Sequence, residues 1–233
     1  FFFFFFLVLL FLLATCLGFS KCLSTNSYFT PENKNHAKTI LLQAVDAKDF
    51  ASVHFGILGL KLLGESIPKS NELCKFFFEA SNAPVLNAEI QFYIATTYNA
   101  LGKCPQALPV MKMVKALNSV IGESTNMQEL YYAVNALKAL NQKPQDVAKL
   151  IKSMQAILKK NDSHVNLGYL FHIASNLGSD GAFAFERIED AVVQADEVDS
   201  NYLQFEGGLS ITGKYQVSFY YKKFYFILKK INY

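Results

Sequence analysis

Histidine side chains can bind a metal ion or transfer protons, so their spacing is weighed first. None of the four histidines falls in an H-E-x-x-H or H-x-x-x-H arrangement. His164 and His172 are separated by more than two helical turns, which is too far for one metal ion. We therefore expect all four to be surface or packing residues: His36, His54, His164 and His172.

Acidic residues could act as a general acid and base where two carboxylates converge. The candidates are the adjacent Glu189 and Asp190 and the acidic run at 196–199, which look more like a solvated helix face and a helix end. Serine-nucleophile and phosphate-loop motifs are absent from the sequence, and the glycine pair at 207–208 lacks the preceding strand that a phosphate loop needs. The sequence thus predicts no catalytic residue, no cofactor-binding residue and no metal ligand.

The first 20 residues hold 17 apolar residues and no charge, and small residues follow at once. This pattern predicts a signal peptide over residues 1–22 that is removed, with a retained membrane anchor as the alternative. The mature chain is then luminal or extracellular. Because the sequence begins without methionine, we expect its reading frame to start upstream.

Secretion changes how the cysteines are interpreted. After cleavage only Cys74 and Cys104 remain, an even pair in an oxidising compartment, which favours a disulfide. Two buried free thiols are the alternative, and a zinc site is disfavoured because no histidines stand at ligand spacing. A glycosylation sequon begins at Asn161, in a polar stretch between two helical patterns.

An internal repeat organises most of the chain. Four times, an aromatic residue is followed nine positions later by a glycine or asparagine with leucine just before it, and these stop residues recur with a period near 38. Glycine and asparagine enter the left-handed conformation that ends many helices. Four helices are therefore predicted, running from the aromatic residue to the stop: Phe55 to Gly64, Tyr93 to Gly102, Tyr132 to Asn141 and Tyr169 to Gly178.

A second set of helical patterns lies between and beyond these four. They cover 38–47, 71–80, 106–117, 145–158 and 182–197, and a fifth copy of the repeated helix is expected to begin at residue 202. The predicted fold is all-α, an array of helical hairpins in which each hairpin buries its apolar face on its neighbours. The pattern alone leaves an open α/α solenoid and a partial α/α toroid as alternatives.

Three consecutive aromatic residues, Phe76, Phe77 and Phe78, could line a ligand pocket. They are interpreted instead as a cluster at the edge of the core. Three neighbours on one helix cannot all face inward, so one of them could meet a partner protein.

The end of the chain differs from the rest. Residues 217–233 contain seven Phe or Tyr and no acid, and the codons that these residues need are rich in A and T. We expect this tail to be a translated intron, with an amphipathic basic helix at a membrane surface as the alternative. The predicted organisation is a signal peptide at 1–22, a helical-repeat domain at 23–216 and a divergent tail at 217–233.

Composition and charge exclude several classes of protein. With 52% apolar and 18% charged residues the chain is not disordered. The net charge of +3 comes from the two ends, since residues 23–216 carry a net of −2 and the only arginine is Arg187. No nucleic-acid partner is predicted.

Several stretches resemble a known family, the amino-terminal luminal region of ribophorin II. The most specific is YLQFEGGL at 202–209, and Cys74 and Cys104 also fit. The remaining stretches are YFT at 28–30, VHFGILGL at 53–60, ALGK at 100–103 and YYAV at 131–134. The resemblance covers about residues 23–216.

The resemblance implies a non-catalytic luminal subunit of the oligosaccharyltransferase complex, which supports N-linked glycosylation in the endoplasmic reticulum. Its expected partners are other subunits of that complex, and no cofactor is implied. Family members continue into β-rich and transmembrane regions, so contact with the endoplasmic reticulum membrane is expected only through a carboxy-terminal region that this chain lacks. The alternatives are a secreted helical-repeat adaptor or an α/α-toroid enzyme unrelated to glycosylation.

Overall fold

The computed structural model describes residues 29–188, 191, 193, 195–198 and 202–215. The predicted signal peptide at 1–22 and the divergent tail at 217–233 lie outside these residues. Most of the described chain folds into consecutive helices that form an array of hairpins: α3 (Pro31–Asp46), α4 (Phe50–Leu62), α5 (Ser70–Ser81), α6 (Ala88–Leu101), α7 (Val110–Glu123), α8 (Met127–Ala139), α9 (Val147–Lys160) and α10 (His164–Asn176).

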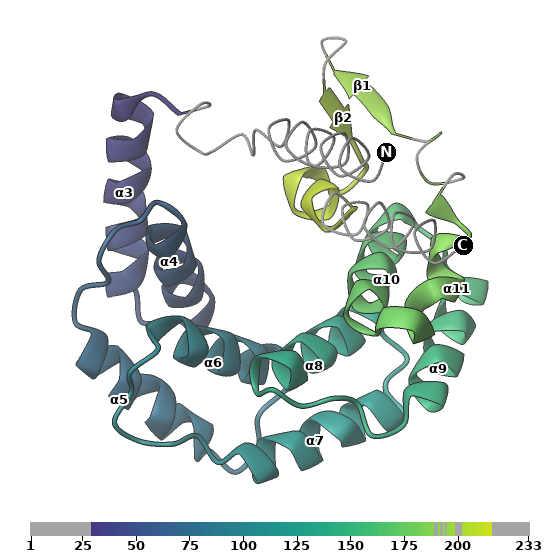
Figure 1. Ribbon diagram of the computed structural model, residues 1–233, viewed down its shortest axis with the longest axis horizontal. Coiled ribbons are helices and arrows are strands. Elements are labelled where there is room, and N and C mark those ends of the chain that lie inside the picture. The colour runs from purple at the N-terminus through teal and green to yellow at the C-terminus, as the bar shows by residue number, and fades with distance from the viewer. Residues whose placement is uncertain (1–28, 189–190, 192, 194, 199–201, 216–233) are drawn as a thin grey trace, which may run out of the picture.

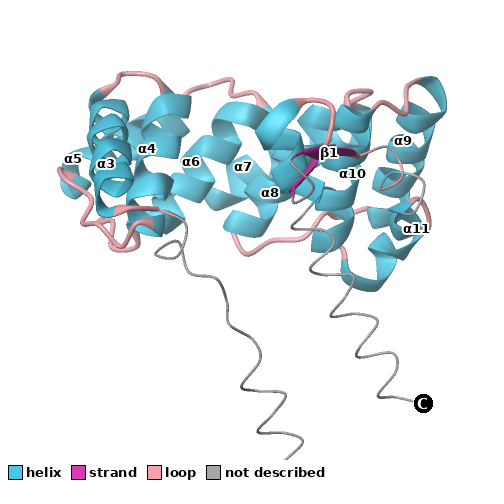
Figure 2. Cartoon of the chain, turned by 90° about the horizontal axis from the view of Figure 1, so that it is seen from above, coloured by secondary structure: helices cyan, strands magenta, loops and turns pink. Residues whose placement is uncertain are grey.

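The hairpins stack into an open arc with two layers (Figure 1). Helices α4, α6, α8 and α10 form the inner layer, and each contacts the next along the chain. Helices α5, α7 and α9 form the outer layer, while α3 packs against α4 at one end. Figure 2 shows the same array from above, with the helices side by side. The all-α array is confirmed, and its shape is that of an open solenoid.

Each inner helix begins at a capping residue whose side chain accepts a hydrogen bond from a backbone N–H of the first turn. These bonds satisfy donors that have no partner inside the helix. The distance from the backbone nitrogen to the side-chain oxygen is 2.8 Å at Asp49, Asn87 and Asn126, and 3.5 Å at Ser163.

The same four helices end as the sequence predicts, but each begins five residues before the aromatic residue from which it was expected to run. The residue that follows each last turn has a positive φ, which only glycine and, at some cost, asparagine adopt readily. The values are +76° at Gly64, +80° at Gly102, +56° at Asn141 and +61° at Gly178. At Asn141 the next residue, Gln142, donates its N–H to the carbonyl of Leu137 at 2.8 Å and closes the helix end.

The two layers differ in how they are buried. Outer helix α7 buries one stripe, with Met113, Leu117 and Ile121 at spacings of four residues. Inner helix α8 is buried over much of its circumference, from Leu130 to Leu137, because it is packed between other helices. Outer helix α7 starts at Val110 rather than at 106 as predicted, since Pro109 occupies the cap position.

The predicted continuous helix over 182–197 is wrong: among the residues described there, only 182–185, 188 and 191 are helical, and 196–198 form a strand. A 3₁₀ turn, η1 (Gly178–Gly181), leads into α11 (Ala182–Phe185), which has a single turn. The chain then reaches β1 (Asp196–Val198), which pairs antiparallel with β2 (Tyr202–Gln204). Gly181 explains the tight turn between α10 and α11: a Cβ there would lie 2.0 Å from the carbonyl oxygen of Ala174, so only glycine lets the chain pass this close to α10.

The predicted fifth copy of the repeated helix is also wrong. Residues 202–204 form strand β2, and helix resumes only at residues 208–215. The acidic run at 196–199, interpreted as a helix end, contributes its first three residues to β1. Glu189 and Asp190 lie outside the described residues.

Candidate interaction surface

An aromatic row crosses the inner layer from α4 to α10. Ring contacts join each inner helix to the next, with centroids 6.0 Å apart between Phe55 and Tyr93, 6.0 Å between Phe92 and Tyr131, and 4.9 Å between Tyr131 and Tyr169. Pairs at these separations add stabilisation beyond the area that they bury. We define the aromatic row as Phe55, Phe92, Tyr93, Tyr131, Tyr132 and Tyr169; it includes all four aromatic residues that mark the sequence repeat.

Glu89, in the first turn of α6, ties two members of the row together. Its Oε1 accepts hydrogen bonds from the hydroxyl of Tyr93 at 2.9 Å and from the hydroxyl of Tyr132 at 3.0 Å. Burial, and then the bond to Glu89, raises the pKa of Tyr93 well above its ordinary value. The phenol therefore stays protonated and keeps donating to the carboxylate, which joins α6 to α8.

Lys214 covers the far end of the row. Its Nζ lies 4.9 Å from the ring centroid of Tyr169 and 5.3 Å from that of Tyr131. The ring faces attract a cation, a contact worth about 0.5–2 kcal/mol depending on its exposure to water. Burial lowers the pKa of Lys214, and the ammonium also donates to Ser210 Oγ at 2.9 Å.

Residues 205–215 dock on α10 and bring Lys214 to the row. Phe205 and Tyr215 are buried and stack with ring centroids 4.0 Å apart, and the Tyr215 hydroxyl donates to the carbonyl of His164 at 3.2 Å. Gly168 leaves room for this contact, because a Cβ there would lie 3.0 Å from Ile211 and 3.3 Å from Tyr215. The docked segment thus forms the end of the array.

Two histidines, His54 and His172, pack inside the inner layer, which agrees with the prediction that each histidine is a surface or packing residue. His54 is 1% exposed, and its Nδ1 is 2.9 Å from Thr97 Oγ1. The Nε2 of His172 is 3.2 Å from Asn135 Oδ1. Burial lowers the pKa of each to about 4, so both imidazoles are neutral at physiological pH. Among the described residues no three His, Cys, Asp or Glu side chains come together to hold a metal ion.

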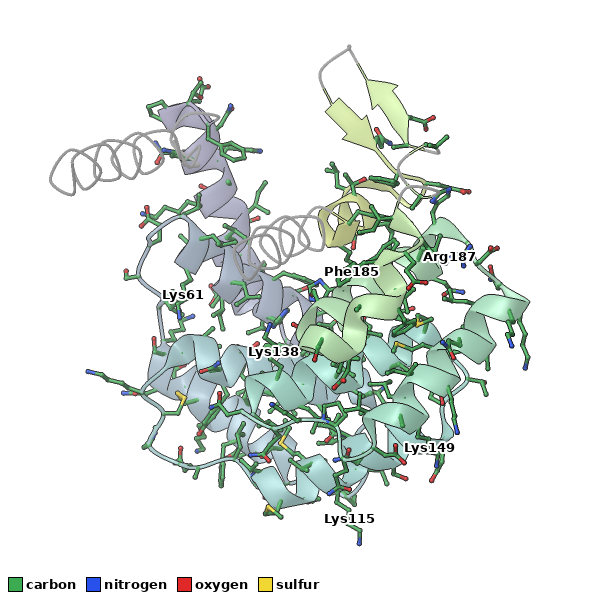
Figure 3. The ribbon with its side chains drawn as sticks, turned by 45° about the vertical axis from the view of Figure 1, so that its right-hand side comes forward. Lys61, Lys115, Lys138, Lys149, Phe185 and Arg187 are labelled. Carbon is green, nitrogen blue, oxygen red and sulfur yellow. A yellow bond between two sulfur atoms is a disulfide. The ribbon has the colours of Figure 1, made fainter. Side chains whose placement is uncertain are left out.

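Two lysines brace the ends of the inner helices (Figure 3). Lys61 of α4 donates to the carbonyl of Ala100 in α6 at 3.0 Å, and Lys138 of α8 donates to Asn176 Oδ1 in α10 at 2.6 Å. Cations near helix C-termini are favoured by the partial negative charge there. Both side chains therefore bond to the neighbouring inner helix of the array.

The family model for the ribophorin II N-terminal domain matches residues 29–220. The chain belongs to the ribophorin II family. Within the described residues, the stretch YLQFEGGL at 202–209 forms β2 and the turn into the helical residues 208–215. Its two glycines, Gly207 and Gly208, have φ values of +101° and +74° and hold a turn that other residues enter only with strain.

In this ribophorin II family member, Cys74 of α5 and Cys104, just after α6, lie together. The two Sγ atoms are bonded, and the Cα atoms are 5.4 Å apart, within the usual range for a disulfide. The bond joins the two helices of one hairpin. Phe77, near Cys74 on α5, is fully buried, while Phe76 and Phe78 are half-buried, as expected for a cluster at the edge of the core.

Asn161 lies in the short loop between α9 and α10 and is exposed. Its Oδ1 accepts the N–H of Ser163 at 3.0 Å. Arg187 donates to the Asp162 carboxylate at 3.0 Å, and this bond holds the pKa of Asp162 below its ordinary value. The sequon is thus at the surface, with its central residue paired.

An open pocket lies beside this loop, where α11 only partly covers α9 and α10. Leu158, Leu170 and Phe183 line it together with Lys159 and Arg187. Figure 3 shows Phe185 and Arg187 on the segment that borders it.

No helix among the described residues is long and apolar enough to span a bilayer.

Sequence reasoning found one aromatic residue per repeat but missed their neighbours and their polar partner. Glu89 stands one helical turn before Tyr93, a spacing that places both on one face of α6. That spacing was a usable signal. Nothing in the sequence indicated that Tyr132, 43 residues further on, donates to the same oxygen, or that Lys214 lies on the same row.

Proposed function

We propose that this chain is the luminal, non-catalytic part of an oligosaccharyltransferase subunit that supports N-linked glycosylation of nascent proteins in the endoplasmic reticulum. The observation that carries the proposal is the family match over residues 29–220. Membership of the ribophorin II family indicates a subunit of that complex.

The form of the array suits a role in protein contacts. Stacked helical hairpins present extended surfaces on which a partner can contact several helices at once. Here the inner layer carries the aromatic row, whose first member, Phe55, is 58% exposed. Such a side chain contributes more to a protein interface than to the stability of an isolated chain.

A luminal location is supported by the apolar start of the sequence and by the cysteine pair. Disulfides form and persist in the secretory pathway and are rare in the cytosol.

We include in the proposal that Asn161 receives a glycan, because it is an exposed sequon residue. Treatment of the microsomal protein with a glycosidase should increase its mobility on a gel, and Asn161→Gln should abolish that increase.

Affinity purification from microsomes tests the function. The tagged full-length protein that contains these residues should recover the catalytic subunit of the oligosaccharyltransferase. Recovery of the protein without that subunit would overturn the assignment. Transfer of glycan to an acceptor peptide by the purified protein alone would overturn the non-catalytic part instead.

A further inference from the structure

The aromatic row has two halves that differ in what covers them. At the α8–α10 end, Lys214 lies over the rings of Tyr131 and Tyr169. At the α4–α6 end, no lysine or arginine of the described residues lies over a ring, and Phe55 is 58% exposed. The same kind of surface is therefore covered by a cation at one end and open at the other.

The open half also holds an acid that forms no ion pair with another described residue. Glu89 takes part in none of the ion pairs formed among the described residues. Its hydrogen bonds come from two neutral phenols, Tyr93 and Tyr132, which fix the position of the carboxylate without neutralising it. A carboxylate fixed beside aromatic rings attracts a cation, because the rings exclude part of the water, and a cation that also reaches a ring face is attracted by that face.

We propose that Glu89, Phe55, Phe92 and Tyr132 form a receptor for a lysine or arginine side chain on a basic segment of a partner protein. The ammonium or guanidinium group would pair with Glu89, and its apolar stem would lie along the rings of Phe55 and Phe92. The proposal rests on the proposed function only in taking the partner to be a subunit of the same complex.

The chemistry of the surface selects this occupant. An acidic segment or a phosphate group would be repelled by Glu89, and Lys61 lies outside the receptor because it donates to Ala100 at the end of the helix. A purely apolar segment would leave the Glu89 carboxylate desolvated and unpaired, which costs free energy. Lys214 supplies an example within the chain, since this lysine already lies over the rings of Tyr131 and Tyr169 at the α8–α10 end of the row.

Photo-crosslinking in microsomes tests the receptor in the assembled complex. The full-length protein carries p-benzoylphenylalanine in place of Phe55, and a matched protein carries it in place of Met111, which is 80% exposed on outer helix α7. Position 55 should crosslink to a subunit of the complex at a segment that contains lysine or arginine, whereas position 111 should not. A crosslink from position 55 only to lipid, glycan or an acidic segment would overturn the proposal.

Charge variants test whether the crosslink from position 55 depends on the charge of Glu89 or only on the proximity of a partner. Glu89→Gln keeps an acceptor for both phenols but removes the charge, and it should lower the crosslink yield from position 55 by about five-fold. Glu79→Gln, an exposed acid on outer helix α5, is the control and should change the yield by less than about two-fold. Equal yields for Glu89→Gln and the unmodified protein would overturn the proposal.

A peptide competitor identifies the charge that is recognised. Acetyl-(Ala-Lys)6-amide should reduce the crosslink from position 55, and acetyl-(Ala-Glu)6-amide should not; equal competition by both would overturn the proposal. Recovery of the catalytic subunit with the same protein is measured in parallel. Loss of the subunit refutes the proposed function, whereas its recovery without a basic crosslink refutes only the receptor.

Discussion

The array from α3 to α10 and the segment after it follow the same chain but are built differently. Each inner helix of the array has a side-chain cap at its start and a left-handed residue after its end. After Gly178 come two single turns, η1 and α11, then a two-stranded antiparallel pair, and helix resumes at residues 208–215. The segment is then held to α10 by contacts that include those of Phe205, Ile211 and Tyr215.

The comparison teaches how a repeat array ends. A hairpin in the middle buries both sides on its neighbours, whereas the last one has only one neighbour. Here the exposed side of α10 receives a non-repeating segment, and Gly168 provides the space for it. Substitutions at many buried positions should therefore destabilise the array, whereas docking of the terminal segment should depend on the positions where it contacts α10.

Breaking the disulfide in the array should have the largest effect. Reduction, or Cys74→Ser with Cys104→Ser, removes a crosslink that closes a loop of about 30 residues, and the free energy of unfolding should fall by up to about 3.7 kcal/mol. Urea denaturation measures the loss. Hydrogen exchange should increase in α5 and α6 first; an increase confined to 205–215 would contradict the local role of the bond.

A cavity in the inner layer should cost nearly as much. Leu137 of α8 is fully buried, and Leu137→Ala should lower the free energy of unfolding by about 3 kcal/mol, from lost burial and the cavity that remains. Leu62→Ala is the control, because Leu62 is 76% exposed and should change stability by less than about 0.5 kcal/mol. Similar losses for both variants would refute the description of the inner layer as the core.

Acid should weaken the array through His54. Its pKa is lowered to about 4 in the folded protein from an ordinary 6.5, because burial disfavours the imidazolium. The unfolded chain thus binds a proton more readily between these pH values, so stability that is present above pH 6.5 is lost as the pH falls toward 4. We expect a loss of about 2 kcal/mol between pH 7 and pH 5 from this residue.

Urea denaturation at the two pH values measures this loss. His54→Gln, which does not titrate, should make the dependence smaller by the same amount. An unchanged pH dependence in His54→Gln would show that other groups cause it.

The smallest predicted effect is at the junction between the two regions. Gly168→Val places a side chain against Ile211 and Tyr215, and the resulting strain should weaken docking of 205–215 by about 1.5 kcal/mol. Hydrogen exchange should increase in residues 205–215 but not in α4–α8. Gly213→Ala is the control, since no atom lies within 4 Å of its added Cβ and helix propensity favours alanine.

Much of the array was predictable because the signals that end its helices lie close to those ends in the sequence. Four helix ends, the all-α fold and the ribophorin II resemblance all followed from residues close together in sequence. Prediction was wrong after Gly178, where 182–197 has the composition of a helix. There the pairing of β1 with β2 decides the conformation of residues 196–198, and helical periodicity does not encode that pairing.

The sequence by itself determined where the inner helices end, because a left-handed residue acts on its own turn of helix. It also marked one aromatic residue in every repeat. Only the tertiary structure decided that these residues form one row, that Tyr93 and Tyr132 share Glu89, and that Lys214 covers Tyr169. These contacts join residues about 40 positions apart, so they depend on how successive hairpins stack rather than on the local pattern of any one of them.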